Sequence, residues 1–135
     1  MLEQEKIIAK VREQAVADEL VAAVLMYGSF TQGVGDAFSD VEFYVFVKDE
    51  DDAFKVLDTL QWISGVTPVD VHFLNDYGTE VVVFQNLIRG EFHFMPQSEM
   101  HVIEGFAPIG YVPDIESMCL YDADGNRRRY LEKLD

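Results

Sequence analysis

The chain has 135 residues, of which 25 are acidic and 10 basic, giving a formal net charge of −15. A domain of this length can bury roughly two-thirds of its unfolded surface, and a hydrophobic content of 49% argues against a disordered chain. The negative charge repels a phosphate backbone, which argues against a nucleic-acid substrate, and it attracts metal ions and cationic small molecules.

The cysteine count and the first residues predict a compartment. Cys119 is the only cysteine, so no internal disulfide can form and a reducing compartment, the cytoplasm, is expected. The opening sequence MLEQEK is too charged for a signal peptide. No apolar run approaches the roughly 20 residues of a membrane helix, so neither secretion nor membrane insertion is predicted.

The first elements are a helix and two strands. Between residues 2 and 20, apolar side chains recur at three- and four-residue spacings, which predicts an amphipathic helix with a scaffold role. An apolar run over 21–27 predicts a buried strand, and a second strand is predicted over 40–47.

The connection between these strands is rich in glycine. Gly28 allows the backbone to leave the first strand at an angle that a Cβ would obstruct, and Ser29 offers a hydroxyl and an N–H group to an anion. Gly33 and Gly35 keep the connection slim enough for a phosphate chain to lie against it. We therefore expect nucleotide binding at Gly28 and Ser29; a turn without a ligand is the alternative.

The second strand carries two carboxylates. Ser39 precedes it, and Asp40 and Glu42 point to the same face because side chains alternate along a strand. Two carboxylates so placed repel each other unless a divalent cation lies between them, and Mg²⁺ commonly takes one or two protein carboxylates plus substrate phosphates. The alternative is a pair of solvent-facing acids at a strand edge.

The second half of the chain predicts further helices and strands. A helix is expected from about Ala53 to Trp62, with Asp51 and Asp52 complementing the dipole at its N-terminus. Alternating apolar residues in Val69–Leu74 predict a half-buried strand. The remaining predicted elements are a hairpin loop at 75–78, strands at 79–84, 91–95 and 118–121, weak helical character over 98–106 and a short helix from 126.

Several blocks together resemble a known family. Gly28-Ser29, a glycine-containing spacer and Ser39-Asp40-Val41-Glu42 resemble the signature of nucleotidyltransferases of the DNA polymerase β type. Over nearly the whole chain, MYGSFTQGVGDAFSDVEFYVF, YGTEVVVFQNLIRGEFHF and GYVPD are similar to the N-terminal domain of lincosamide nucleotidyltransferases. The resemblance implies one α+β nucleotidyltransferase domain over 1–135, with a mixed β-sheet flanked by helices. The helical C-terminal domain usual in such enzymes is absent from this sequence.

The resemblance also implies an activity. Such enzymes use Mg²⁺ and ATP, or GTP, to transfer a nucleoside monophosphate to a hydroxyl of a small molecule. A lincosamide is a fitting acceptor, since its basic amine would be attracted by an acidic cleft. A single domain supplies only one wall of such a cleft, so a homodimer is predicted. The alternatives are a minimal nucleotidyltransferase that modifies a partner protein, as in toxin–antitoxin pairs, and a non-catalytic nucleotide-binding or dimerising module.

A third carboxylate remains open. Glu91 lies in the block most similar to lincosamide enzymes, where the matching glutamate acts as general base, and this resemblance makes Glu91, with Asp40 and Glu42, the predicted catalytic set. Asp70 looks like the third metal-binding acid of small nucleotidyltransferases, and Glu80 is a weaker candidate. His93 shares a face with Glu91 and could orient it or contact nucleotide, or be a structural histidine. The resemblance also implies that Ser29 contacts the β- or γ-phosphate, and it includes Ser39 among the nucleotide-binding residues.

Overall fold

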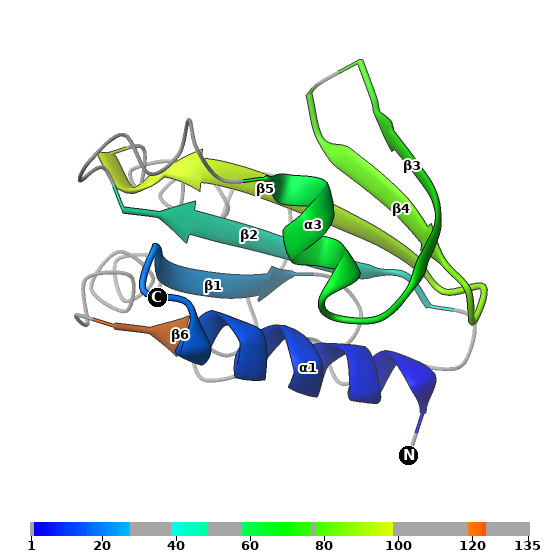
Figure 1. The fold of residues 1–135 in the computed structure, drawn as a ribbon, viewed down its shortest axis with the longest axis horizontal. Coiled ribbons are helices and arrows are strands. Elements are labelled where there is room, and N and C mark those ends of the chain that lie inside the picture. Colours follow the sequence, from blue (N-terminus) through cyan, green and yellow to red (C-terminus); the bar gives the residue numbers. More distant parts are fainter. Residues whose placement is uncertain (1, 28–38, 49–57, 77, 99–118, 124–135) are drawn as a thin grey trace.

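The computed structural model describes residues 2–27, 39–48, 58–76, 78–98 and 119–123 (Figure 1). Within these ranges the chain forms two helices and six strands. They are α1 (Glu3–Ala17), β1 (Val21–Tyr27), β2 (Val41–Val47), α3 (Thr59–Ser64), β3 (Val69–Leu74), β4 (Glu80–Phe84), β5 (Arg89–Pro96) and β6 (Cys119–Asp122).

All six strands belong to one sheet, in the order β3-β4-β5-β2-β1-β6. β2 pairs with β5 in parallel, and the other neighbouring strands pair antiparallel. Parallel pairing requires a crossover of a dozen or more residues, and α3 and the β3–β4 hairpin lie in the crossover between β2 and β5. The mixed sheet and its helices confirm the predicted α+β fold class.

Both helices cover the same face of the sheet. Ile7, Val11 and Ala15, spaced four residues apart, form the buried stripe of α1, and Trp62 and Ile63 enter the same core from α3. In Figure 1, α3 lies over the part of the sheet formed by β2 and β5. The strand residues of this core are Val21, Val24, Met26, Val41, Phe43, Val45, Val82, Phe84 and Phe92.

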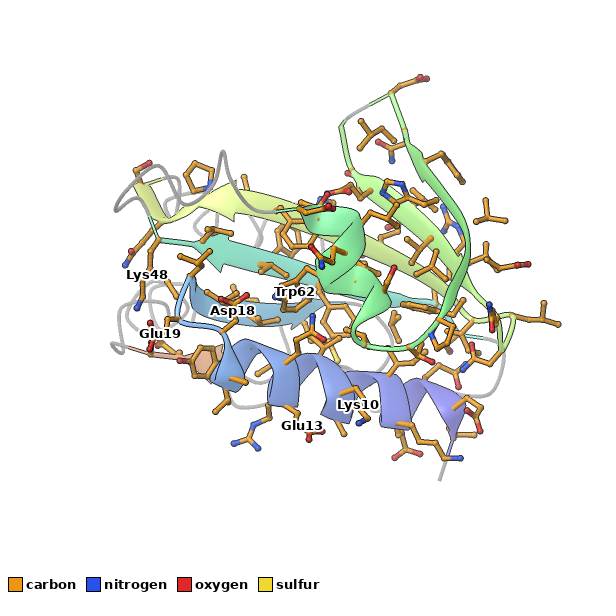
Figure 2. All side chains as sticks on the ribbon, in the orientation of Figure 1. Lys10, Glu13, Asp18, Glu19, Lys48 and Trp62 are labelled. Atoms are coloured by element: carbon orange, nitrogen blue, oxygen red, sulfur yellow. The ribbon has the colours of Figure 1, made fainter. Side chains whose placement is uncertain are left out.

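Polar contacts also tie the helices together. Trp62 Nε1 donates a hydrogen bond to Asp18 Oδ2 at 3.1 Å, just beyond the end of α1 (Figure 2). Gln14 Nε2 donates to the backbone carbonyl of Trp62. The indole therefore buries its ring in the core and still has a partner for its N–H group, as buried tryptophans require.

Most predicted elements are confirmed, and one helix needs correction. The first helix, the first two strands, the antiparallel β3–β4 hairpin, the strand at β5 and the edge strand β6 form where the sequence predicts them. The helix expected from Ala53 to Trp62 instead begins at Thr59 and ends at Ser64 in the described part of the chain. The reason is Asp58, whose carboxylate accepts the Gln61 N–H at 3.0 Å as an N-cap and whose backbone is extended. The predictions for 49–57, 99–106 and the tail from 126 fall outside the described residues.

The prediction that β3 is half-buried is wrong. Val71, Phe73 and Leu74 are 46%, 48% and 64% exposed. β3 is an edge strand, and Figure 1 shows the β3–β4 hairpin projecting beyond the helices. Alternation identified a strand correctly. Val71 and Phe73, however, alternate with His72, which lies on the helical side beside Glu80, so they point to the other face, which the described helices do not cover.

Candidate active site

The acidic residues of the site lie on the face of the sheet away from α1 and α3. Phe43 and Phe92 are fully buried on the helical side, so their neighbours along each strand point the other way. The parallel register of β2 and β5 sets these neighbours side by side. Its pairs on this face include Glu42 with Glu91 and Tyr44 with His93.

Three side chains of this face form a group that could hold a cation. One ligand atom from each of Glu42, Glu91 and His93 lies within 4.8 Å of the other two, and all three residues are partly buried. Two carboxylates fit a divalent cation such as Mg²⁺, which shares its shell with waters and substrate phosphates. The donor set therefore suits a metal–nucleotide complex, and the imidazole adds a nitrogen beside it.

His93 is bonded at both ring nitrogens. Its Nε2 lies 3.0 Å from Glu42 Oε1, and its Nδ1 lies 3.2 Å from Thr79 Oγ1. Tyr44 stacks on the imidazole, with ring centroids 4.2 Å apart and planes 7° from parallel. His93 is therefore hydrogen-bonded to Glu42, whereas its place in the sequence predicts an interaction with Glu91.

Asp40 lies at the entry to β2 and meets a different partner. Arg89 Nη1 is 3.0 Å from Asp40 Oδ2, and Arg89 Nη2 is 3.1 Å from Glu91 Oε1. The hydrogen bond that Arg89 donates to Asp40, with the nearby charges of Glu91 and Asp40, raises the pKa of the guanidinium despite some opposing desolvation. Arg89 is 44% exposed, so solvent screens these pairs and their main effect is to place a positive charge between two carboxylates.

Tyr44 is a neutral group at this site. Burial, followed by the negative charge of Glu42, raises the pKa of its phenol to about 12. The hydroxyl therefore keeps its proton at neutral pH and cannot act there as a base.

Of the third-acid candidates, the structure brings only Glu91 beside Glu42. Asp70 is exposed on the edge strand β3, which β4 and β5 separate from β2. Glu80 is buried on the opposite, helical face, where its Oε1 accepts from Thr59 Oγ1 at 2.5 Å and lies 2.9 Å from His72 Nε2. Its surroundings are those of a structural carboxylate between α3 and the β3–β4 hairpin.

The predicted nucleotide-binding residues are only partly described. Gly28 and Ser29 lie outside the described residues. Ser39 directly precedes Asp40, and its backbone carbonyl accepts a hydrogen bond from Gln4 Nε2 at 3.0 Å. Gln4 is only 1% exposed, so a buried amide of α1 anchors the chain where it enters β2.

Arg89, Thr79 and Tyr44 were missed in the sequence. Arg89 stands directly before the Gly90-Glu91 pair, so its proximity to Glu91 could have been noticed. The contacts of Thr79 with His93 and of Arg89 with Asp40 depend on strand pairing across 14 and 49 residues of chain, for which no local pattern gives a signal.

Comparison with known proteins identifies the fold. No family model matches the chain, and no curated protein sequence matches it. Among solved structures it matches an aminoglycoside 6-adenyltransferase from Bacillus subtilis, with a TM-score of 0.53 and 18% sequence identity. The fold is that of a nucleotidyltransferase. The match covers 78% of this chain and 40% of that structure's chain, so this sequence spans less than half of the larger protein.

The helices of the nucleotidyltransferase fold seen here are short or amphipathic. Among the described residues, no helix has the length and apolar character needed to cross a bilayer.

Proposed function

We propose that the chain is the catalytic domain of a nucleotidyltransferase that transfers a nucleoside monophosphate from ATP, or GTP, to a hydroxyl of a cationic small molecule. The observation that carries the proposal is the pairing of Glu42 with Glu91 across β2 and β5, on the face of the sheet away from α1 and α3. The two carboxylates lie close enough, with His93, to hold one cation.

The proposed roles follow from the chemistry of the transfer. Asp40 and Glu42 would hold a divalent cation, which when bound neutralises the triphosphate and assists its reaction. The hydroxyl oxygen of the acceptor attacks the α-phosphorus, its proton passes to a carboxylate oxygen of Glu91, and pyrophosphate leaves. Glu91 stands beside Glu42 in the strand register, so the base would lie next to a cation held at Glu42.

Asp40 can serve this role only by exchanging a partner. Its Oδ2 is bound to Arg89 Nη1 at 3.0 Å, and a cation would compete with the guanidinium for that oxygen. Since the pair is solvent-exposed, the exchange costs little. Gly28, Ser29 and Ser39 remain the proposed contacts of the nucleotide.

The acceptor is proposed from charge. A net charge of −15 favours a cationic acceptor, and an aminoglycoside adenyltransferase shares the fold. We propose an antibiotic-like acceptor with a basic amine, such as a lincosamide. The remaining wall of the acceptor site would come from a second copy of the chain, as a homodimer. The proposal places the protein in the cytoplasm, where Cys119 stays reduced.

A product assay tests this function. The chain is incubated with Mg²⁺, each nucleoside triphosphate and a panel of lincosamides and aminoglycosides, and products are identified by mass spectrometry. The expected product is a drug heavier by one nucleoside monophosphate, absent with Glu42→Gln. A modified protein in place of a modified drug would support the partner-protein alternative, and no product with any acceptor or nucleotide would overturn the proposal.

A further inference from the structure

The imidazole of His93 is held in one orientation by its neighbours. Tyr44 is its register partner in the parallel pair and stacks flat against it at 4.2 Å. Thr79, which is 6% exposed, bonds to its Nδ1. Ring rotation would break the contacts on both nitrogens and the stack together.

Thr79 is itself fixed by the turn between β3 and β4. Its N–H donates to Asn75 Oδ1 at 3.0 Å, and its carbonyl accepts the Asn75 N–H at 3.0 Å. The hydroxyl of Thr79 therefore approaches the ring from a defined direction. This gives a continuous chain of contacts from the hairpin turn through Thr79 and His93 to Glu42.

The chemistry of these partners assigns the protons. A carboxylate only accepts hydrogen bonds, so the Glu42 contact requires a proton on His93 Nε2. In the neutral ring, Nδ1 is then unprotonated and accepts from the Thr79 hydroxyl. The carboxylate thus selects the Nε2–H tautomer, and the Thr79 hydroxyl stabilises it by donating to Nδ1.

We propose that His93 is a positioning residue that fixes the Glu42 carboxylate for metal–nucleotide binding, with Thr79 fixing His93 in turn. This inference rests on the proposed nucleotidyltransferase function. A carboxylate has two oxygens, so Glu42 can accept the His93 hydrogen bond on Oε1 and bind a cation through Oε2. Metal-ligating carboxylates are commonly oriented by such hydrogen bonds, and losing them lowers metal affinity by about 10- to 100-fold.

Three substitutions separate the contacts. His93→Phe keeps a ring that can stack on Tyr44 but removes both nitrogens. Thr79→Val keeps the shape of the side chain and removes its hydroxyl, whereas Thr79→Ser keeps the hydroxyl. The matched control is His72→Phe, which removes a histidine bonded to a glutamate on the opposite face of the sheet.

Binding of Mn²⁺ with a non-hydrolysable ATP analogue is measured by calorimetry for the folded variants. His93→Phe is expected to weaken binding by about 10- to 100-fold. Thr79→Val should weaken it less, Thr79→Ser should restore it, and Thr79→Val should add nothing when His93 is already Phe. The control His72→Phe should bind like the wild type. If His93→Phe does not fold, the Thr79 series carries the test.

Nitrogen NMR of the imidazole provides a readout that a purely structural histidine would not change. We expect the Nε2–H tautomer in the wild type and in Thr79→Val, because Glu42 accepts from Nε2 in both, and a mixture of tautomers in Glu42→Ala. The inference is overturned if the wild type binds Mn²⁺ and nucleotide but His93→Phe binds equally well. It is also overturned if metal binding removes the proton from Nε2, because His93 would then be a ligand. Failure of the wild type to bind metal and nucleotide at all would overturn the proposed function, and the inference with it.

Discussion

Glu91 is the register partner of Glu42 across two adjacent parallel strands, although the whole of α3, β3 and β4 lies between them in the chain. Side chains paired in this way project from neighbouring strands to the same face. The distance between the two carboxylates is thus determined by the backbone of the sheet, which is more rigid than a loop.

The first prediction concerns the general base. Glu91→Gln retains the shape of the side chain but removes the basic oxygen, so turnover should fall by about 10²- to 10⁴-fold while metal–ATP affinity changes little. Asp70→Asn should have a much smaller effect, because Asp70 is exposed on the edge strand. Steady-state kinetics and calorimetry on both variants check this. Loss of turnover in Asp70→Asn together with an active Glu91→Gln would reverse the assignment.

A second prediction concerns Arg89. Its guanidinium bonds to Asp40 and Glu91 and competes with a cation for these oxygens, so Arg89→Gln should bind Mg²⁺ alone more tightly than the wild type. Lys10→Gln makes the same change of charge at an exposed side chain of α1, on the other face of the sheet. It should leave Mg²⁺ affinity unchanged. Calorimetric titration with Mg²⁺ at low salt measures both. Equal or weaker binding by Arg89→Gln would show that the guanidinium does not compete.

The third prediction concerns the buried pair of His72 and Glu80. The side chain of Glu80 is only 10% exposed, and removing the imidazole leaves its carboxylate with one hydrogen-bond partner fewer. His72→Phe should therefore lower the free energy of unfolding by about 1–3 kcal/mol. Adding Glu80→Gln removes the charge and should recover part of this loss. Urea unfolding of the single and double variants gives the values. A double variant that is less stable than His72→Phe would contradict this explanation.

A fourth prediction follows from the pKa of Tyr44, which burial and then Glu42 raise to about 12 in the folded state. The unfolded phenol loses its proton near pH 10, so between about pH 10 and 12 the folded chain binds more protons than the unfolded chain. The free energy of unfolding of the wild type should therefore fall as the pH rises through this window. In Tyr44→Phe it should fall less steeply. Urea unfolding at several pH values compares the slopes, and identical slopes would count against the raised pKa.

The fifth prediction concerns Leu87 in the turn between β4 and β5. Its φ is 70°, in the left-handed region, and its side chain is 80% exposed, so it has strain without compensating burial. This conformation costs a non-glycine residue about 1–2 kcal/mol, so Leu87→Gly should raise the free energy of unfolding. The gain is reduced because glycine gives the unfolded chain more conformational entropy. Thermal unfolding is the measurement, with Leu87→Ala as control. A lower melting temperature for Leu87→Gly than for Leu87→Ala would contradict it.

The sequence predicted the elements better than their surroundings. Period-two alternation located β3 to the residue but could not tell whether the face was covered, and Phe73 proved exposed. Helical spacing extended a helix through Asp58, where a local side-chain cap begins it. The candidate acids Asp40, Glu42 and Glu91 could be named from motifs, whereas the contacts of Arg89 and Thr79 depend on long-range pairing that no short segment encodes.

The parallel pairing of β2 and β5 has a consequence for how this protein could change its acceptor. Glu42 and Glu91 both lie near the starts of their strands, where they are set by the register, and a shift of one residue would turn either carboxylate to the helical face. Connections between strands generally tolerate more substitution and insertion than the strands themselves, apart from positions such as Ser29 that are proposed to contact the nucleotide. New acceptor specificity can therefore evolve, or be engineered, by exchanging loops around a reactive centre that stays in place.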